Sequence, residues 1–92
     1  MLEHCLYKLL KNKDYNLSGM KINYIREDEN FYVVYFTEKI ESIGRPLIYR
    51  IKKKTGENEA VYLPNAENFE FLDYFDNCKY VNIPEKYCNK YF

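Results

Sequence analysis

The side chains of this sequence that could supply a nucleophile and a base are three cysteines and one histidine. Cys5, Cys78 and Cys88 are far apart in the sequence, and His4 is adjacent to Cys5. Neighbouring positions on a helix diverge by about 100°, so His4 and Cys5 cannot readily share a proton. A pairing of His4 with Cys78 or Cys88 stays open, but it needs a third group to orient the histidine. We expect His4 to be a surface residue and predict no catalytic residue.

The same residues could bind a metal, but their spacing does not favour it. Structural zinc sites use closely spaced ligand pairs such as C-x-x-C, and the sequence has none. Three widely spaced cysteines are typical of free, mostly buried thiols in a reducing compartment. The sequence also lacks G-x-S-x-G, H-E-x-x-H and glycine-rich nucleotide motifs. We therefore predict no metal, no cofactor and no enzymatic activity.

The run K-K-K-T-G-E, residues 52–57, could hold a phosphate or form the tip of a β-hairpin. A phosphate-binding loop has the form G-x-x-x-x-G-K-[ST] between a strand and a helix, and its backbone N–H groups hold the anion. Here there is one glycine, Gly56, and segments of strand composition lie on both sides. Gly56 can supply the positive φ that hairpin loops require. We predict a hairpin whose lysines form a patch that could touch an anion.

Charge is sorted into blocks along the sequence, although the net charge is zero. Residues 1–26 carry five bases and two acids (+3), and residues 27–42 carry one base and five acids (−4). Residues 43–56 carry five bases and no acid (+5), and residues 57–78 carry six acids and no base (−6). The last 14 residues carry +2. A solvated surface usually interleaves the two signs, so the blocks favour binding of a charged partner.

The acids of the fourth block define the predicted partner-binding surface. Four of them recur every three residues, one turn apart on a helix, where like charges repel by roughly a few tenths of a kcal/mol per pair. Their repetition therefore points to a role other than helix stability. The alternative is that they form the solvated face of an amphipathic helix. The predicted partner-binding residues, with neighbouring tyrosines, are Glu57, Glu59, Tyr62, Glu67, Glu70, Asp73, Tyr74 and Asp76.

Length and composition set the remaining bounds. The 92 residues suffice for a single domain, residues 1–92, and 47% hydrophobic with 30% charged residues is typical of a folded protein. No apolar run approaches the roughly 18 residues of a membrane span. The N-terminal segment contains Glu3 and lacks the basic region and cleavage site of a signal peptide. We expect a cytoplasmic protein with no membrane partner.

Aromatic residues are abundant: 11 tyrosines and 6 phenylalanines in this short chain. Those in predicted strands, Tyr24, Tyr35 and Tyr49, are expected in the core or half-buried in a sheet. Tyrosines with polar neighbours are expected at an interface, namely Tyr62, Tyr74, Tyr87 and Tyr91. RNA-binding sheets also display aromatic and basic residues, for which Tyr32 and Arg50 are candidates. The zero net charge and the lack of an RNA-binding motif argue against direct nucleic-acid binding.

Hydrophobic periodicity predicts two helices and at least four strands. Apolar residues at helical spacing predict a helix over about residues 2–13, and a second helix is predicted over Ala66–Asn77 after a capping asparagine. Met20, Ile22 and Tyr24 alternate with more polar residues and predict a strand with one buried face. Further strands are predicted at 31–37, 47–54 and 59–63, with a charged turn at 26–30 and a possible short strand at 80–83.

Consecutive strands joined by short loops pair as an antiparallel meander. The segment Phe31–Thr37 is apolar on both faces and is predicted to be central. The fold class predicted is α+β: two layers, with a four-stranded antiparallel meander and an N-terminal and a C-terminal helix on one face. The tyrosine-rich residues after Pro84 are expected to be ordered only if their rings dock.

The segment Arg45–Glu57, which contains P-L-I-Y-R-I-K-K-K-T-G-E, follows the aromatic strand F-Y-V-V-Y-F. In this arrangement, over residues 20–63, the chain resembles small immunity proteins of bacterial polymorphic-toxin systems. The family pattern usually has a small or acidic residue where this chain has the basic run Arg50–Lys54. The resemblance implies a protein that binds and neutralises a cognate toxin and has no chemistry of its own.

These observations lead to the prediction of a non-enzymatic inhibitor of another protein. The acidic helix and the adjoining hairpin would cover a basic active site or a nucleic-acid groove of the partner. Two alternatives stay open. One is a phage-encoded anti-defence inhibitor of a host nucleic-acid-binding protein. The other is a small-molecule-binding module with a tyrosine-lined pocket between sheet and helix.

Overall fold

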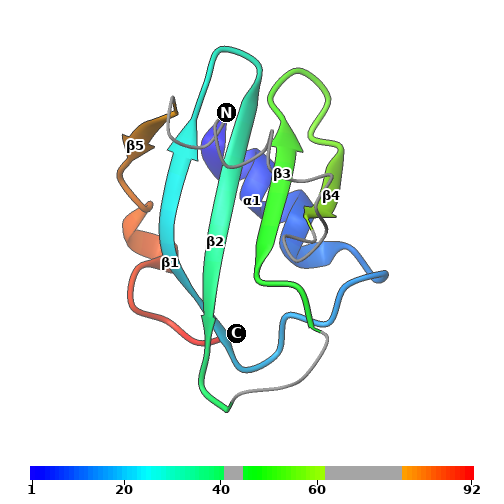
Figure 1. Ribbon diagram of the computed structural model, residues 1–92, viewed down its shortest axis with the longest axis vertical. Helices are drawn as coiled ribbons and strands as arrows, with labels where there is room; N and C mark the ends of the chain where they lie inside the picture. Colours follow the sequence, from blue (N-terminus) through cyan, green and yellow to red (C-terminus); the bar gives the residue numbers. More distant parts are fainter. Residues whose placement is uncertain (41–44, 62–77) are drawn as a thin grey trace, which may run out of the picture.

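A computed structural model describes residues 1–40, 45–61 and 78–92 of the chain (Figure 1). Five strands form one antiparallel sheet in the order β4-β3-β2-β1-β5, so β2 is central as predicted. The chain is therefore α+β, with one N-terminal helix and this sheet in the described residues. The elements are α1 (Leu2–Lys11), β1 (Met20–Glu27), β2 (Phe31–Glu38), β3 (Ile48–Lys52), β4 (Asn58–Val61), β5 (Lys79–Val81) and the 3-10 helix η2 (Glu85–Tyr87).

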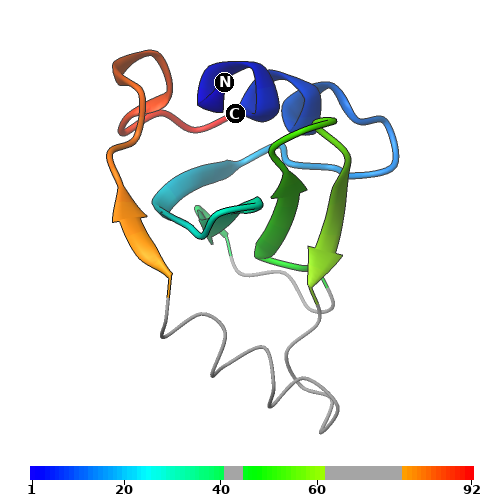
Figure 2. The same ribbon diagram turned by 90° about the horizontal axis from the view of Figure 1, so that it is seen from above.

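The helix α1 packs on one face of the sheet, and the segment after β5 lies on the same side (Figure 2). Cys5, Leu6 and Leu9 on one side of α1 are buried in a core that includes Tyr49 and Ile51 of β3. The predicted amphipathic helix is confirmed, although it ends at Lys11 because the next residue is extended. We call this side of the sheet the helix face and the opposite side the outer face.

The alternation in β1 is interrupted by a bulge, which corrects one prediction. Met20 and Ile22 are buried as predicted, but the pairing with β2 shifts between Ile22 and Tyr24. The extra residue reverses the direction of the following side chains, as β-bulges do. Ile25 therefore takes the buried position on the helix face, and Tyr24 lies on the outer face, stacked on Tyr35 of β2 at 4.2 Å between ring centroids.

The sheet has a fifth strand, so the predicted four-stranded meander is incomplete. β5 pairs with the C-terminal half of β1, where Ile25, Arg26 and Glu27 face Val81, Tyr80 and Lys79. Arg26 and Glu27 thus belong to β1, and the turn predicted at 26–30 is confined to 28–30. A short strand was expected near residues 80–83, but a strand this short gives no sequence signal for its partner. The predicted C-terminal helix, Ala66–Asn77, lies outside the described residues.

The C-terminal residues dock on the sheet. Tyr87 is 7% exposed and belongs to the helix-face core, which corrects its prediction as an interface tyrosine. Tyr91 forms an isolated bridge with Lys21, and the Phe92 N–H donates to the Met20 carbonyl at 2.8 Å. These contacts cover the half of the β1 edge that β5 leaves open. Within the described residues, no helix has both the length and the apolar character needed to cross a membrane.

The tip of the β3–β4 hairpin is tied to α1. Gly56 has φ +78°, as the hairpin prediction requires. The Lys8 ammonium donates to the Thr55 carbonyl at 2.9 Å, and its side chain lies against Gly56. At the free edge of the sheet, which β4 forms, the Ala60 N–H donates to the Tyr15 hydroxyl at 3.2 Å. Satisfying this edge group makes β4 a poorer template for pairing with another chain.

The contact between Lys8 and Gly56 can be tested with two glycine variants. Gly19 and Gly56 have the same φ within 1°, but an added Cβ meets nothing within 4 Å at Gly19 and lies 2.5 Å from Lys8 Cδ at Gly56. Both alanine variants should lose about 1–2 kcal/mol of unfolding free energy through backbone strain. Gly56→Ala should lose a further ~0.5–1 kcal/mol because Lys8 must release Thr55.

Urea unfolding of the two single variants measures this difference. In a Lys8→Ala background, Gly56→Ala should cost no more than Gly19→Ala does in the wild-type chain. Equal losses for the two glycine variants in the wild-type chain would show that the contact between Lys8 and the turn adds nothing to stability.

Candidate interaction surface

Strand pairing arranges the outer face into rows of side chains that cross the sheet. Arg50 of β3 stands between Val33 of β2 and Glu59 of β4. One row nearer the hairpin tip, Lys52 stands opposite Phe31 on one side. Its N–H donates to the Glu57 carbonyl at 2.8 Å on the other side. Residues two apart on a strand point to the same face, so the two rows lie side by side on the outer face.

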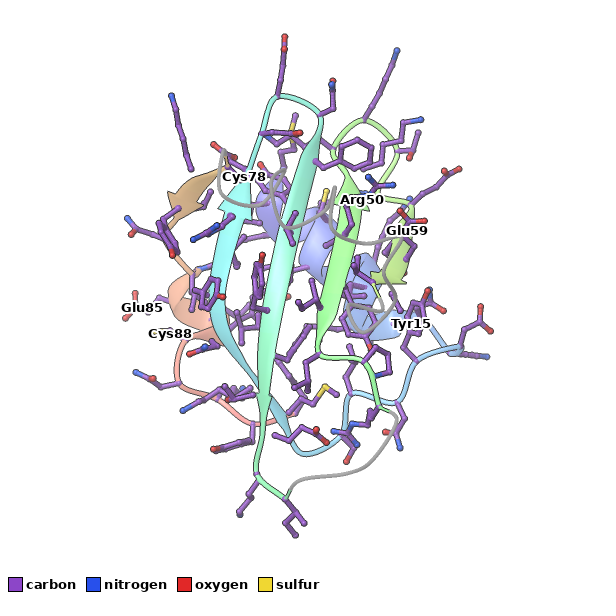
Figure 3. All side chains as sticks on the ribbon, in the orientation of Figure 1. Tyr15, Arg50, Glu59, Cys78, Glu85 and Cys88 are labelled. Carbon is purple, nitrogen blue, oxygen red and sulfur yellow. The ribbon has the colours of Figure 1, made fainter. Side chains whose placement is uncertain are left out.

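These two rows line a shallow groove of about 260 Å³ that we call the Phe31 groove. Its lining residues are Phe31, Arg50, Lys52, Glu57, Asn58 and Glu59. Figure 3 shows Arg50 and Glu59 close to each other on neighbouring strands. The groove is open to solvent, and its lining combines one aromatic ring with acids and bases. Such a surface is suited to contact another macromolecule rather than to enclose a small molecule.

Arg50 is held in a fixed position in this groove. Its Nε donates to Glu59 Oε1 at 2.8 Å, and its Nη2 donates to the same oxygen. The guanidinium also lies 4.3 Å from the centroid of the Phe31 ring. Arginine favours stacking on aromatic faces and forked contacts with carboxylates. The pairing therefore orders a side chain that would otherwise have many rotamers.

Lys52 and Glu57 are opposite in sign and neighbours across the hairpin, yet they do not pair as Arg50 and Glu59 do. Both are exposed, and within the described part of the chain neither side chain forms an ion pair. Their charges are therefore available to a partner. The Phe31 groove thus has one internally paired row, Arg50 and Glu59, and one row whose charges form no ion pair in the described residues.

The charge blocks of the sequence are brought together by strand pairing. The three ion pairs of the described residues each join a base of residues 43–56 to an acid of an adjacent acidic block. They are Arg45 with Glu38 at 3.5 Å, Lys53 with Glu27 at 3.1 Å, and Arg50 with Glu59. Consecutive strands of a meander are neighbours, so blocks of alternating sign meet. Part of the sorted charge therefore serves cross-strand pairing.

Two of the predicted partner-binding residues are brought together, and the others cannot be placed. Glu57 and Glu59 both line the Phe31 groove. Tyr62, Glu67, Glu70, Asp73, Tyr74 and Asp76 lie outside the described residues. Sequence reasoning did not include Phe31, Arg50 and Lys52 in the surface. The alternation in β3 could have placed Arg50 and Lys52 on one face, but the pairing with Phe31 depends on a register that the sequence does not state.

The structure separates the two residues considered for an RNA-binding face. Tyr32 pairs with Ile51 and is buried on the helix face, where its ring lies under the Lys53 ammonium. Arg50 pairs with Val33 and lies on the outer face. Tyr32 and Val33 are neighbours on β2, so their side chains point to opposite faces of the sheet. Arg50 lies on the face of Val33, and Tyr32 and Arg50 therefore cannot form one surface.

The three cysteines differ in exposure, and His4 does not share the buried environment of its neighbour Cys5. Cys5 is 1% exposed, whereas His4 is exposed, as predicted. Burial raises the pKa of the Cys5 thiol, which lowers its content of reactive thiolate. Cys78 is buried and Cys88 is exposed. The described residues contain no group of three or more His, Cys, Asp or Glu side chains placed to hold a metal ion.

A cluster of aromatic rings and one arginine lies on the outer face toward the β5 edge of the sheet, over β5, β1 and β2. The Arg26 guanidinium lies 4.4 Å from the centroid of the Tyr80 ring and 5.9 Å from that of Tyr24. Tyr24 stacks on Tyr35, and burial of the Tyr35 phenol raises its pKa well above the ordinary value. The neighbouring Tyr24 acts in the same direction, and the Arg26 charge opposes it.

The raised pKa of Tyr35 predicts a loss of stability at alkaline pH. In the unfolded chain a tyrosine phenol ionises at roughly pH 10, while the folded state still holds the proton. The unfolded state then binds fewer protons, so the free energy of unfolding falls as pH rises beyond that point. Tyr35→Phe should reduce this slope in urea unfolding at several alkaline pH values. Tyr7→Phe, on the exposed side of α1, controls for the substitution. An unchanged slope in Tyr35→Phe would contradict the burial argument.

Comparison of the chain with protein-family models, with curated proteins and with solved structures finds no match. The surface therefore has to be interpreted from its own chemistry. That chemistry consists of an ordered arginine on an aromatic ring, a carboxylate that holds it, and an adjacent lysine and glutamate that form no ion pair in the described residues.

Proposed function

We propose that this chain is a non-enzymatic inhibitor that binds another protein, of the immunity type that neutralises a toxin. The observation that carries the proposal is the Phe31 groove, where Arg50 is ordered between Phe31 and Glu59 beside the exposed charges of Lys52 and Glu57. Arginine and aromatic residues are enriched among the residues that dominate binding energy at protein interfaces.

The order of the groove supports binding to a protein surface. A side chain that is immobilised on association costs about 0.5–1.5 kcal/mol of entropy. Arg50 is already immobilised by Glu59 and Phe31, so a partner that packs against it avoids most of this cost. The pair itself adds little to stability, since partly exposed ion pairs contribute about 0–1 kcal/mol.

The proposed mechanism is occlusion of a basic surface on the partner. Glu57 is exposed, and it begins the block of residues 57–78 that contains six acids and no base. A basic active site or nucleic-acid groove of a toxin is complementary to this block. A phage-encoded inhibitor of a host nucleic-acid-binding protein uses the same complementarity, so the two functions differ in the partner and share the contact.

Small-molecule binding in the Phe31 groove, or between α1 and the sheet, has less support. The tyrosines between α1 and the sheet, Tyr32 and Tyr49, are packed core residues. The Phe31 groove is open, and at about 260 Å³ it falls below the roughly 300–1,000 Å³ typical of ligand pockets. Its lining is mostly charged, whereas small-molecule pockets are predominantly apolar.

The proposal is tested by neutralisation. The chain is co-expressed with the product of the gene adjacent to its own, and survival of the cells is scored. Binding of the two purified proteins is then measured by calorimetry. Glu57→Lys reverses a charge that faces the partner, and it should weaken binding about tenfold through like-charge contact. Glu85→Lys makes the same charge change on the exposed 3-10 helix η2 and should bind like the wild type.

Three results would count against the proposal. The first is an adjacent gene product that is harmless to cells, or one that is toxic and binds the chain without being neutralised. The second is equal weakening by Glu57→Lys and Glu85→Lys, which would show that net charge, and not the Phe31 groove, governs binding. The third is turnover of any substrate by the purified chain, which would show that the chain is an enzyme.

A further inference from the structure

A second hollow adjoins the Phe31 groove at the hairpin end of the sheet. It has a volume of about 600 Å³, and we call it the lysine trough. Its lining residues are Met1, Glu29, Asn30, Phe31, Lys52, Lys53 and Lys54. Phe31 and Lys52 line both hollows. The Met1 side chain, the Phe31 ring and the methylene stems of the lysines give the trough a largely apolar lining.

The three consecutive lysines differ in their partners. Lys53 points to the helix face, where it forms an ion pair with Glu27 at 3.1 Å and lies 4.7 Å from the centroid of the Tyr32 ring. Lys52 and Lys54 are exposed and form no ion pair within the described part of the chain. The trough therefore presents the ammonium groups of Lys52 and Lys54, which form no ion pair in the described residues, together with the carboxylate of Glu29 beside an apolar surface.

The walls of the trough are fixed to one another. The Lys53 N–H donates to the Asn30 carbonyl at 2.9 Å, which joins the tips of the β1–β2 and β3–β4 hairpins. The Asp28 carboxylate accepts from the N–H groups of Asn30 and Phe31, and this closes the β1–β2 turn. Lys8 holds Thr55 from α1. A hollow whose walls are already ordered binds with a smaller entropic cost.

We propose that the lysine trough binds an acidic segment of the partner protein that presents one apolar side chain. The apolar side chain lies between Phe31 and Met1, and flanking carboxylates reach Lys52 and Lys54. The inference rests on the proposed function, because it names the chemistry of the partner at a second contact. Charge complementarity supplies the specificity, and burial of the apolar side chain supplies affinity.

A nucleic acid fits this end of the molecule less well than an acidic peptide does. A polyanionic strand carries a charge at every phosphate, and beyond the trough it would meet Glu57 in the adjoining groove. The turn also has a single glycine, Gly56, and its N–H already donates to the Lys52 carbonyl at 2.7 Å. It therefore offers no cradle of free backbone N–H groups for a phosphate.

The two hollows, which meet at Phe31, then prefer partner groups of opposite charge. The Phe31 groove contains the exposed carboxylate of Glu57, which suits a basic group of the partner, whereas the lysine trough suits an acidic one. A partner that matches both can dock in one orientation only, because reversal would place like charges together.

The test uses the full chain, labelled with ¹⁵N, and short peptides followed by NMR. The probe is acetyl-Asp-Glu-Leu-Asp-amide. Its controls are a peptide with serine in place of leucine, a basic peptide with lysines in place of the acids, and a short oligothymidylate. The acidic leucine peptide should give saturable shifts at the amides of Phe31, Lys52 and Lys54. The serine peptide should bind about fivefold more weakly, since it lacks the apolar side chain.

Two lysine variants complete the test. Lys52→Gln/Lys54→Gln should weaken binding of the acidic peptide at least about fivefold by removing both charges. Lys13→Gln/Lys79→Gln removes two exposed lysines elsewhere and should leave binding unchanged. Equal binding of the serine or basic peptide, or no effect of Lys52→Gln/Lys54→Gln, overturns the inference, and stronger binding of the oligothymidylate assigns the trough to nucleic acid. Peptide binding without neutralisation of a toxin would overturn the proposed function and leave the trough intact, and neutralisation without peptide binding would do the reverse.

Discussion

Antiparallel pairing of segments with alternating charge is the constraint on which the described structure depends. Each of the first four strands lies largely in a different charge block, and the meander makes consecutive blocks neighbours. The ion pairs that result are partly exposed and worth about 0–1 kcal/mol each, so they do not hold the fold together. Stability comes from the packed core between α1 and the sheet. The charges act on register instead, because a slip by one residue would bring Arg50 and Glu59 to opposite faces.

The same register creates the candidate surface. Val33, Arg50 and Glu59 form one row, and the next row brings Phe31 beside Lys52. An aromatic ring from the central strand is thereby placed against cations of β3 and acids of the outer strand. Neither the ring nor the charges would mark a site alone. The surface exists because three strands that are separate in sequence are aligned at their hairpin ends.

Much of the fold could be predicted from local patterns. The helical spacing of Leu6 and Leu9 and the apolar content of Phe31–Thr37 were sufficient because period and composition report burial directly. The bulge in β1 was missed because one extra residue leaves no compositional mark. The pairing of β5 with β1 was missed because a three-residue strand draws its stability from its neighbour. Docking of Tyr87 depends on a core formed by distant segments, so no local signal could reveal it.

The candidate site was also predictable only where a local pattern reveals it. Glu57 and Glu59 were identified from charge sorting, which is visible in one dimension. Phe31 and Lys52 required knowledge of which strands pair and in what register. The sorting itself has two uses that the sequence cannot separate. Glu59 is paired with Arg50 within the sheet, whereas Glu57 is exposed and forms no ion pair in the described residues.

The most direct measurement of the central claim is hydrogen exchange of the chain, free and bound to the partner protein that the neutralisation assay identifies. If the aligned hairpin ends form the docking surface, amides of the two tips, around Phe31 and from Lys52 to Glu59, should exchange more slowly in the complex. Amides on the exposed side of α1, around Tyr7, should be unaffected. Protection confined to α1, with unchanged exchange at both hairpin tips, would contradict the account.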